Sequence, residues 1–138
     1  MRLFLDANIL FSAAYRDGSP VEVLFAAARS ERCALVASGF AVEEARRNIA
    51  TKKPDRIEAL EMLLCQVTLS REPTAAAVED ATKHGVPPKD APILAAAVLA
   101  RADVLVTGDR THFGHLYGLK VDGVLVLTTA MVLELMTA

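Results

Sequence analysis

The sequence predicts an α/β fold of three layers, α/β/α, with a mostly parallel sheet of about five strands between helices. Two observations lead to this prediction. Short aliphatic runs, typical of strands buried on both faces, alternate with longer segments of helical periodicity. The chain has 138 residues and is 53% hydrophobic, enough for one buried core. We therefore expect one domain over residues 1–138, with right-handed helical crossovers between strands.

The expected strands are short, apolar and bounded by polar or turn residues. The first, Arg2 to Asp6, ends its Leu-Phe-Leu run in a carboxylate, and the fourth is the equally apolar Val104 to Val106. In chain order, the five predicted strands cover residues 2–6, 34–37, 66–69, 104–106 and 123–127.

The expected helices fill the intervals between these strands. Ser19, Ser38 and Asp90 are predicted N-caps, because serine and aspartate side chains accept hydrogen bonds from the first free backbone amides of a helix. Pro20 would then be the first helical residue of its segment. The predicted helices cover residues 7–14, 20–29, 38–50, 54–64, 73–83, 90–101 and a last segment from 128 or 129 to 136, and the glycine-rich stretch 107–123 is predicted as irregular loop.

Composition narrows the functional classes. The net charge of −2 and the pI of about 5.9 argue against binding nucleic acid through bulk positive charge, although a nuclease with an acidic metal site remains compatible. No run approaches the ~18 to 20 apolar residues of a membrane span, and no export signal is evident, so we expect a cytoplasmic protein. Cys33 and Cys65 are expected to be buried, reduced thiols.

Four acidic residues form the candidate site: Asp6, Glu44, Asp90 and Asp109. Two of them follow predicted strands, and the other two lie on or at the start of predicted helices. Loops at the carboxyl ends of parallel strands build the sites of open α/β sheets. Acids that converge there repel one another, which implies a bound cation.

Each acid also has an ordinary structural explanation. Asp6 and Asp90 suit helix N-caps, Asp109 suits a turn after Gly108, and Glu44 suits a solvated helix face. Glu44 is preferred over Glu43 because it lies roughly 115° from the centre of the apolar stripe of its helix, against roughly 145° for Glu43.

These segments together resemble the PIN domain, the metal-dependent ribonuclease fold of VapC-type toxins of toxin–antitoxin pairs and of RNA-processing nucleases. The resemblance rests on four motifs in order: Leu-Asp6-Ala-Asn8-Ile-Leu, Ser38-Gly-Phe-Ala-Val-Glu-Glu44-Ala, Asp90-Ala-Pro-Ile-Leu, and Val106-Thr-Gly-Asp109. It implies that the four acids form the site, that Asn8 holds the first acid or a water, and that Thr107 lines the site.

Two departures from the family pattern bear on the metal. Ala7 replaces a common Thr or Ser, and Thr111 and His112 stand where many members have a further acid. One Mg²⁺ or Mn²⁺ ion or two are therefore both open. We expect direct ligation by Asp6 and Asp109, with Asp90 and Glu44 acting through water or a second ion.

Basic residues are candidates for contacts with RNA phosphates. The candidates are Arg46, Arg47, Lys52, Lys53, Lys89 and Arg110, of which the last two adjoin site acids. His112 and His115 are read as surface residues, with His112 near RNA, in preference to a zinc pair.

The leading hypothesis is a metal-dependent endoribonuclease, the toxin of a toxin–antitoxin pair. From the resemblance, its partners would be an RNA substrate, a cognate antitoxin and a second copy in a homodimer, with no membrane. The alternative is a non-catalytic PIN-like module that binds nucleic acid or protein. A receiver or an aspartyl-phosphate phosphatase is disfavoured, since Asn8 stands where the phosphatase pattern has a second Asp.

Overall fold

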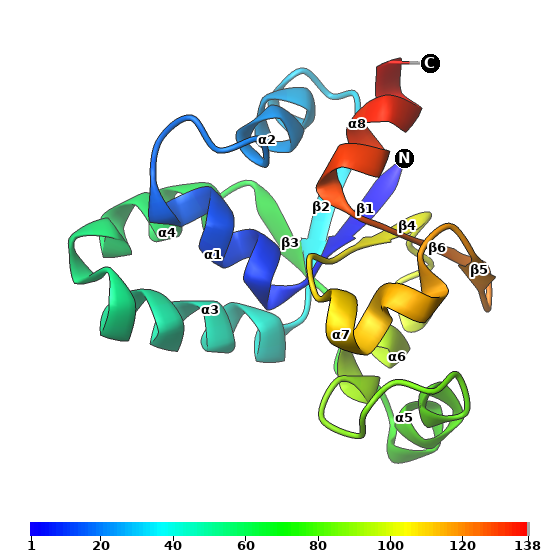
Figure 1. Cartoon of the computed structure of the whole chain (residues 1–138). Helices are drawn as coiled ribbons and strands as arrows, with labels where there is room; N and C mark the ends of the chain where they lie inside the picture. The colour runs from blue at the N-terminus through cyan, green and yellow to red at the C-terminus, as the bar shows by residue number, and fades with distance from the viewer. Residues whose placement is uncertain (138) are drawn as a thin grey trace.

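The computed structural model describes residues 1–137 and contains a six-stranded sheet in the order β3-β2-β1-β4-β6-β5 (Figure 1). The pairings β3–β2, β2–β1, β1–β4 and β4–β6 are parallel, and β5 pairs antiparallel with β6. The strands are β1 (Arg2–Leu5), β2 (Ala34–Ala37), β3 (Val67–Leu69), β4 (Val104–Val106), β5 (Lys120–Val121) and β6 (Val124–Leu127). The predicted mostly parallel α/β sheet is confirmed, with one short strand more than expected.

Side chains of the central strands alternate between the two faces of the sheet. Leu3 and Leu5 of β1 join one buried apolar cluster, whereas Phe4 between them joins the other. Val104 and Val106 of β4 likewise lie on the opposite face from Leu105. Both faces are therefore covered, which explains why these strands are continuously apolar.

Helices form the outer layers (Figure 1). Residues of α1, α2, α3, α4 and α8 join the cluster of Leu3 and Leu5, and residues of α5, α6 and α7 join the cluster of Phe4. The helices are α1 (Ala7–Tyr15), α2 (Glu22–Arg29), α3 (Gly39–Lys52), α4 (Ile57–Leu64), α5 (Ala75–Thr82), α6 (Ala91–Leu99), α7 (Arg110–Phe113) and α8 (Thr129–Thr137), with 3₁₀ turns η1 (Pro54–Arg56) and η2 (Gly114–Leu116).

Ser38 caps α3 as predicted, since its hydroxyl accepts a hydrogen bond from Ala41 N at 3.1 Å. The N-cap predicted for Ser19 is wrong. Helix α2 begins three residues later, and the Ser19 hydroxyl accepts from Val21 N at 3.3 Å in the turn that precedes the helix. Pro20 therefore lies in that turn and outside the helix.

The predicted loop 107–123 is also corrected. It contains α7, η2 and strand β5, because buried Phe113 and Leu116 anchor the segment against the sheet. Of the two cysteines, Cys33 is buried, but Cys65 is exposed because it follows the last turn of α4. Among residues 1–137, no helix combines the length and apolarity needed to cross a bilayer.

Candidate metal centre

The order of the strands places the site. From β1 the chain moves to β2 and β3 on one side, and later returns to β4 and β6 on the other side. The carboxyl ends of the neighbours β1 and β4 therefore lie where the winding reverses, which is where open α/β sheets bind ligands. Asp6 follows β1 at this point, and Thr107 follows β4.

Asp6 is the most buried acid of the site, with 7% of its surface exposed. Its Oδ1 accepts a hydrogen bond from Ala7 N at 2.7 Å, and its Oδ2 accepts one from the Thr107 hydroxyl at 2.8 Å. Burial raises the pKa of the Asp6 carboxyl from 3.8 to about 6, against the opposing effect of these two hydrogen bonds. The negative charges of Glu44 and Asp90 raise this pKa further.

Thr107 and Asn8 join the two strand ends. Thr107 is fully buried, and its hydroxyl also accepts a hydrogen bond from Asp109 N at 3.2 Å. The Asn8 amide reaches Asp6 Oδ2 at 3.4 Å and accepts a hydrogen bond from Gly108 N at 3.0 Å. Both residues therefore hold Asp6 in register with the loop that carries Asp109.

Asp90 stands at the start of α6. This helix leads directly into β4 and runs opposite to it, so its first residue lies at the carboxyl edge of the sheet. Asp90 occupies the N-cap position, yet its side chain makes no capping hydrogen bond. Its Oδ2 is buried and has no hydrogen-bond partner. Burial raises the pKa of the Asp90 carboxyl, an effect that His112 and Lys89 oppose and Asp109 reinforces.

Asp109 caps the short helix α7 and also faces Asp90. Its Oδ1 accepts a hydrogen bond from His112 N at 3.1 Å, and its Oδ2 lies 2.8 Å from His112 Nδ1. The same nitrogen lies 2.9 Å from Asp90 Oδ2. One ligand atom from each of these three residues lies within 4.8 Å of the others. The sequence interpretation did not include His112 in the site, because it treated this segment as loop.

Glu44 and its neighbour Glu43 have different surroundings on α3. Glu43 is exposed and its carboxylate lies 2.7 Å from the Arg46 guanidinium. Glu44 is half-buried, and its charge acts on Asp6. Glu44 is therefore the acid of this pair whose charge reaches Asp6, and its role in the site stays a prediction.

The residues present fit a divalent cation. The carboxylates of Asp90 and Asp109 both approach the single His112 Nδ1, and its hydrogen bond goes to Asp109, so a cation would neutralise the buried Asp90 Oδ2. Asp90 and Asp109 belong with His112 to the compact group of ligand atoms, and Asp6 does not. Direct ligation by Asp6 thus stays a prediction, and both of its oxygens already accept hydrogen bonds.

The basic candidates divide into two groups. Arg46 is engaged by Glu43 and by Glu61, whose carboxylate lies 2.9 Å from it, and the ammonium groups of Lys52 and Lys53 lie 5.6 Å and 5.4 Å from the ring centroids of Phe11 and Tyr15. Arg47, Lys89 and Arg110 are exposed. Lys89 acts electrostatically on Asp90, so it lies near the acids.

Tyr117 is a further residue that the sequence interpretation missed. Its hydroxyl donates a hydrogen bond to the Thr107 carbonyl at 3.0 Å, and burial and the charge of Asp109 raise its pKa. The aromatic ring thus supports the loop between β4 and α7 from the side of η2.

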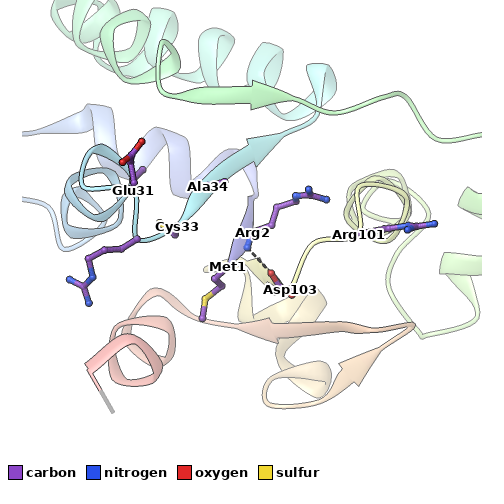
Figure 2. A pocket seen from close by; sticks show the side chains of 9 residues that line it. Met1, Arg2, Glu31, Cys33, Ala34, Arg101 and Asp103 are labelled. Atoms are coloured by element: carbon purple, nitrogen blue, oxygen red, sulfur yellow. Dashed lines mark hydrogen bonds between the residues drawn. The ribbon is translucent and has the colours of Figure 1, made fainter.

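A large cavity lies elsewhere. It has a volume of about 530 Å³ at the amino ends of β1 and β2, and its lining includes Arg2, Glu31, Arg101 and Asp103 (Figure 2). Because Arg2 begins β1, whose opposite end leads into Asp6, this cavity is on the far edge of the sheet from the candidate metal centre.

Comparisons with known proteins agree with this architecture. The chain is similar in fold to VapBC2 from Rickettsia felis bound to a DNA fragment from their promoter (17% identity, TM-score 0.66, 93% of this chain and 98% of that chain). It is also similar to VapBC-1 from nontypeable Haemophilus influenzae (19%, 0.61, 94% and 99%) and to FitAcB from Neisseria gonorrhoeae (21%, 0.59, 93% and 98%). No curated protein sequence matches the chain.

The family comparison covers the strands and helices that carry all four acids. A family model described as PIN domain matches residues 2–111. This range begins at β1 and ends just beyond Asp109, so it includes β1, β4 and the residues that follow each of these strands. The chain therefore belongs to the PIN-domain family.

Proposed function

We propose that this chain is an endoribonuclease that hydrolyses RNA phosphodiester bonds with Mg²⁺ or Mn²⁺ at Asp6, Glu44, Asp90 and Asp109. One observation carries the proposal: the Oδ2 atoms of Asp90 and Asp109 both approach the single His112 Nδ1, whose hydrogen bond goes to Asp109, at the edge where the sheet reverses its winding. Membership of the PIN-domain family supports it, because the members that this sequence resembles are metal-dependent ribonucleases.

The contacts of each side chain indicate its role in the proposed reaction. Asp90 and Asp109 would hold the ion, since their Oδ2 atoms both approach His112 Nδ1. A bound divalent ion supplies an activated water and neutralises charge on the phosphate in the transition state. Asp6 is fixed by Thr107 and by Ala7 N, so it contributes a charge of fixed position.

Glu44 is the acid best suited to orient the attacking water. Within residues 1–137 its carboxylate makes no side-chain hydrogen bond, so it is free to accept one from water. It is half-buried and its charge acts on Asp6, which places it beside the fixed acid. The exposed Lys89 and Arg110 would contact substrate phosphates next to the acids.

The test is cleavage of tRNA, rRNA and mRNA by the purified chain with Mg²⁺ or Mn²⁺. We expect Asp6→Asn to lower the cleavage rate at least about 100-fold, because it removes one charge from the site while keeping its shape. The matched control is Asp103→Asn, which changes an exposed aspartate at the opposite edge of the sheet. This variant should cleave at the wild-type rate.

Cleavage by Asp6→Asn at the wild-type rate would refute the proposed site. If calorimetry finds no binding of Mn²⁺ at millimolar concentration, the alternative of a non-catalytic binding module is favoured. Ala7 and the missing acid at Thr111 and His112 are the sequence features behind that alternative.

The toxin role extends the same proposal. The similar structures are VapBC, FitAcB and related assemblies, and on that basis we expect a cognate antitoxin partner and a homodimer. Light scattering after size-exclusion chromatography measures the oligomeric state. Co-expression with the protein of the adjacent reading frame tests the partner: a stable complex that suppresses cleavage supports the toxin role, and independent elution with undiminished cleavage contradicts it.

A further inference from the structure

We propose that His112 supplies a nitrogen ligand to the divalent ion of the Asp90–Asp109 site and thereby shifts the preference of this site from Mg²⁺ toward Mn²⁺. This inference rests on the proposed function, because it concerns the same ion. It adds a ligand that the four-acid interpretation does not contain, and it states which ion the site selects.

The first argument is the position of the imidazole nitrogen. His112 Nδ1 lies 2.8 Å from Asp109 Oδ2 and 2.9 Å from Asp90 Oδ2, and all three side chains are three-quarters buried or more. One ring nitrogen carries at most one hydrogen atom, so it cannot satisfy both carboxylates. Asp90 Oδ2 is the oxygen left without a partner. A cation between the three atoms would interact with each of them.

The second argument is that the protein backbone fixes this position. Asp109 Oδ1 accepts a hydrogen bond from His112 N at 3.1 Å, which sets the first turn of α7. The next residue, Phe113, is fully buried and anchors the same turn to the core. The imidazole therefore points back over Asp109 because of the helix cap and the core, and both are independent of the ion.

His115 provides a contrast within the same segment. Its Nε2 lies 2.8 Å from the His84 carbonyl oxygen, and the residue is exposed. It does not belong to the group formed by Asp90, Asp109 and His112. The two histidines therefore do not form a joint zinc site, and His115 offers a matched control for substitution.

The third argument is the chemistry of the ligand. Mg²⁺ takes oxygen ligands almost exclusively, whereas imidazole nitrogen suits first-row transition ions. By the sequence resemblance, His112 lies where many family members carry a further acid. Replacing a carboxylate oxygen by an imidazole nitrogen at this point should weaken Mg²⁺ binding relative to Mn²⁺. The other ligand atoms, the carboxylate oxygens of Asp90 and Asp109, suit both ions.

Pulsed electron paramagnetic resonance of the Mn²⁺-loaded wild-type chain tests ligation directly. We expect a nitrogen coupling that changes when the histidines are labelled with ¹⁵N, that persists in His115→Ala and that is lost in His112→Asp. Calorimetry supplies the second readout. The ratio of the Mg²⁺ and Mn²⁺ dissociation constants should fall about tenfold in His112→Asp, which corresponds to about 1.4 kcal/mol, and should stay constant in His115→Ala.

The wild-type spectrum decides ligation even if a variant fails to fold. Mn²⁺-dependent cleavage by a wild-type chain whose spectrum lacks a histidine nitrogen would overturn this inference and leave the proposed function standing. An unchanged ratio of dissociation constants in a folded His112→Asp variant would overturn the claim of ion preference. Absence of both Mn²⁺ binding and cleavage would overturn the proposed function, and this inference with it.

Discussion

The charged residues at the two edges of the sheet differ in their exposure and in their contacts. At the amino edge, Arg2 N donates a hydrogen bond to Asp103 Oδ2 at 2.6 Å, and the surrounding arginines are exposed around a wide cavity (Figure 2). At the carboxyl edge, Asp6 is buried near Glu44 and Asp90, and the buried Asp90 Oδ2 shares its neighbour His112 Nδ1 with Asp109. The large cavity lies at the amino edge, whereas the buried acids lie at the carboxyl edge.

This difference shows which property marks a metal centre. Exposed charges remain solvated by water and require no ligand. Buried acids that repel one another cost free energy in the folded state, and a cation recovers it. The carboxyl edge, whose acids destabilise the metal-free protein, is therefore the edge where we propose that the metal binds and RNA is cleaved.

The largest expected effect is on the stability of the metal-free protein. The pKa of Asp6 is raised to about 6 by burial, so the folded state favours the protonated carboxyl. The stabilisation from protonation is complete below about pH 3.8 and is lost as the pH rises through about 6. Asp6→Asn removes this dependence, so at pH 8 it should be more stable than wild type by about 3 kcal/mol.

Urea denaturation in EDTA between pH 3.5 and pH 8 measures this gap. The difference in stability between Asp6→Asn and wild type should vanish below about pH 3.8 and increase up to about pH 6, where Asp6 titrates. The control Asp103→Asn keeps an oxygen that can accept the hydrogen bond from Arg2 N, so any difference from wild type should not grow as the pH rises to about 6. A gap between Asp6→Asn and wild type that is independent of pH would contradict the burial argument.

The next effect is on cation binding. Asp109→Asn removes one of the two carboxylates that face His112 Nδ1, and we expect it to weaken Mn²⁺ binding about 100-fold, or about 2.7 kcal/mol. Asp103→Asn should bind Mn²⁺ with the wild-type constant. Calorimetric titration at one pH measures both. Equal weakening by the two substitutions would show that the ion is held by general negative charge and not by the carboxyl edge.

The sequence predicted the parts of this site that follow from strand patterns. Leu3 to Leu5 and Val104 to Val106 are fully apolar, and only strands buried on both faces require that. Their shared edge then places Asp6 near the loop of Thr107. The Ser38 cap was equally predictable, because its hydroxyl acts on amides of its own helix.

The sequence did not predict the surroundings of Asp109 and Asp90. Helix α7 has four residues, too few to show periodicity, and it depends on the Asp109 cap and on the burial of Phe113. The only local signal for His112 was its spacing of three from Asp109, which matters only once a helix is assumed. Asp90 stands at an N-cap position, but contact with α7 directs its side chain elsewhere, which no local pattern shows.

A smaller effect is expected at Thr107. Thr107→Val keeps the shape of this fully buried residue but removes the hydroxyl that donates to Asp6 Oδ2 at 2.8 Å. It should cost about 1 kcal/mol above pH 6, where Asp6 is charged, and less at pH 4. Thr107→Ser keeps the hydroxyl, so its cost should be independent of pH. Urea denaturation in EDTA measures both, and a Thr107→Val cost that does not vary with pH would count against the Asp6 hydrogen bond.

The smallest effect compares two neighbours on α3. Glu43 pairs with Arg46 at the surface, so Glu43→Gln should change stability by less than about 0.5 kcal/mol and leave the pKa of Asp6 in place. Glu44→Gln should lower the pKa of Asp6, because the charge of Glu44 helps to raise it. Carbon-13 nuclear magnetic resonance of the Asp6 carboxyl follows the titration. If both substitutions moved this titration equally, Glu43 would act on Asp6 as strongly as Glu44 does. The assignment of Glu44 alone to the carboxyl edge would then be wrong.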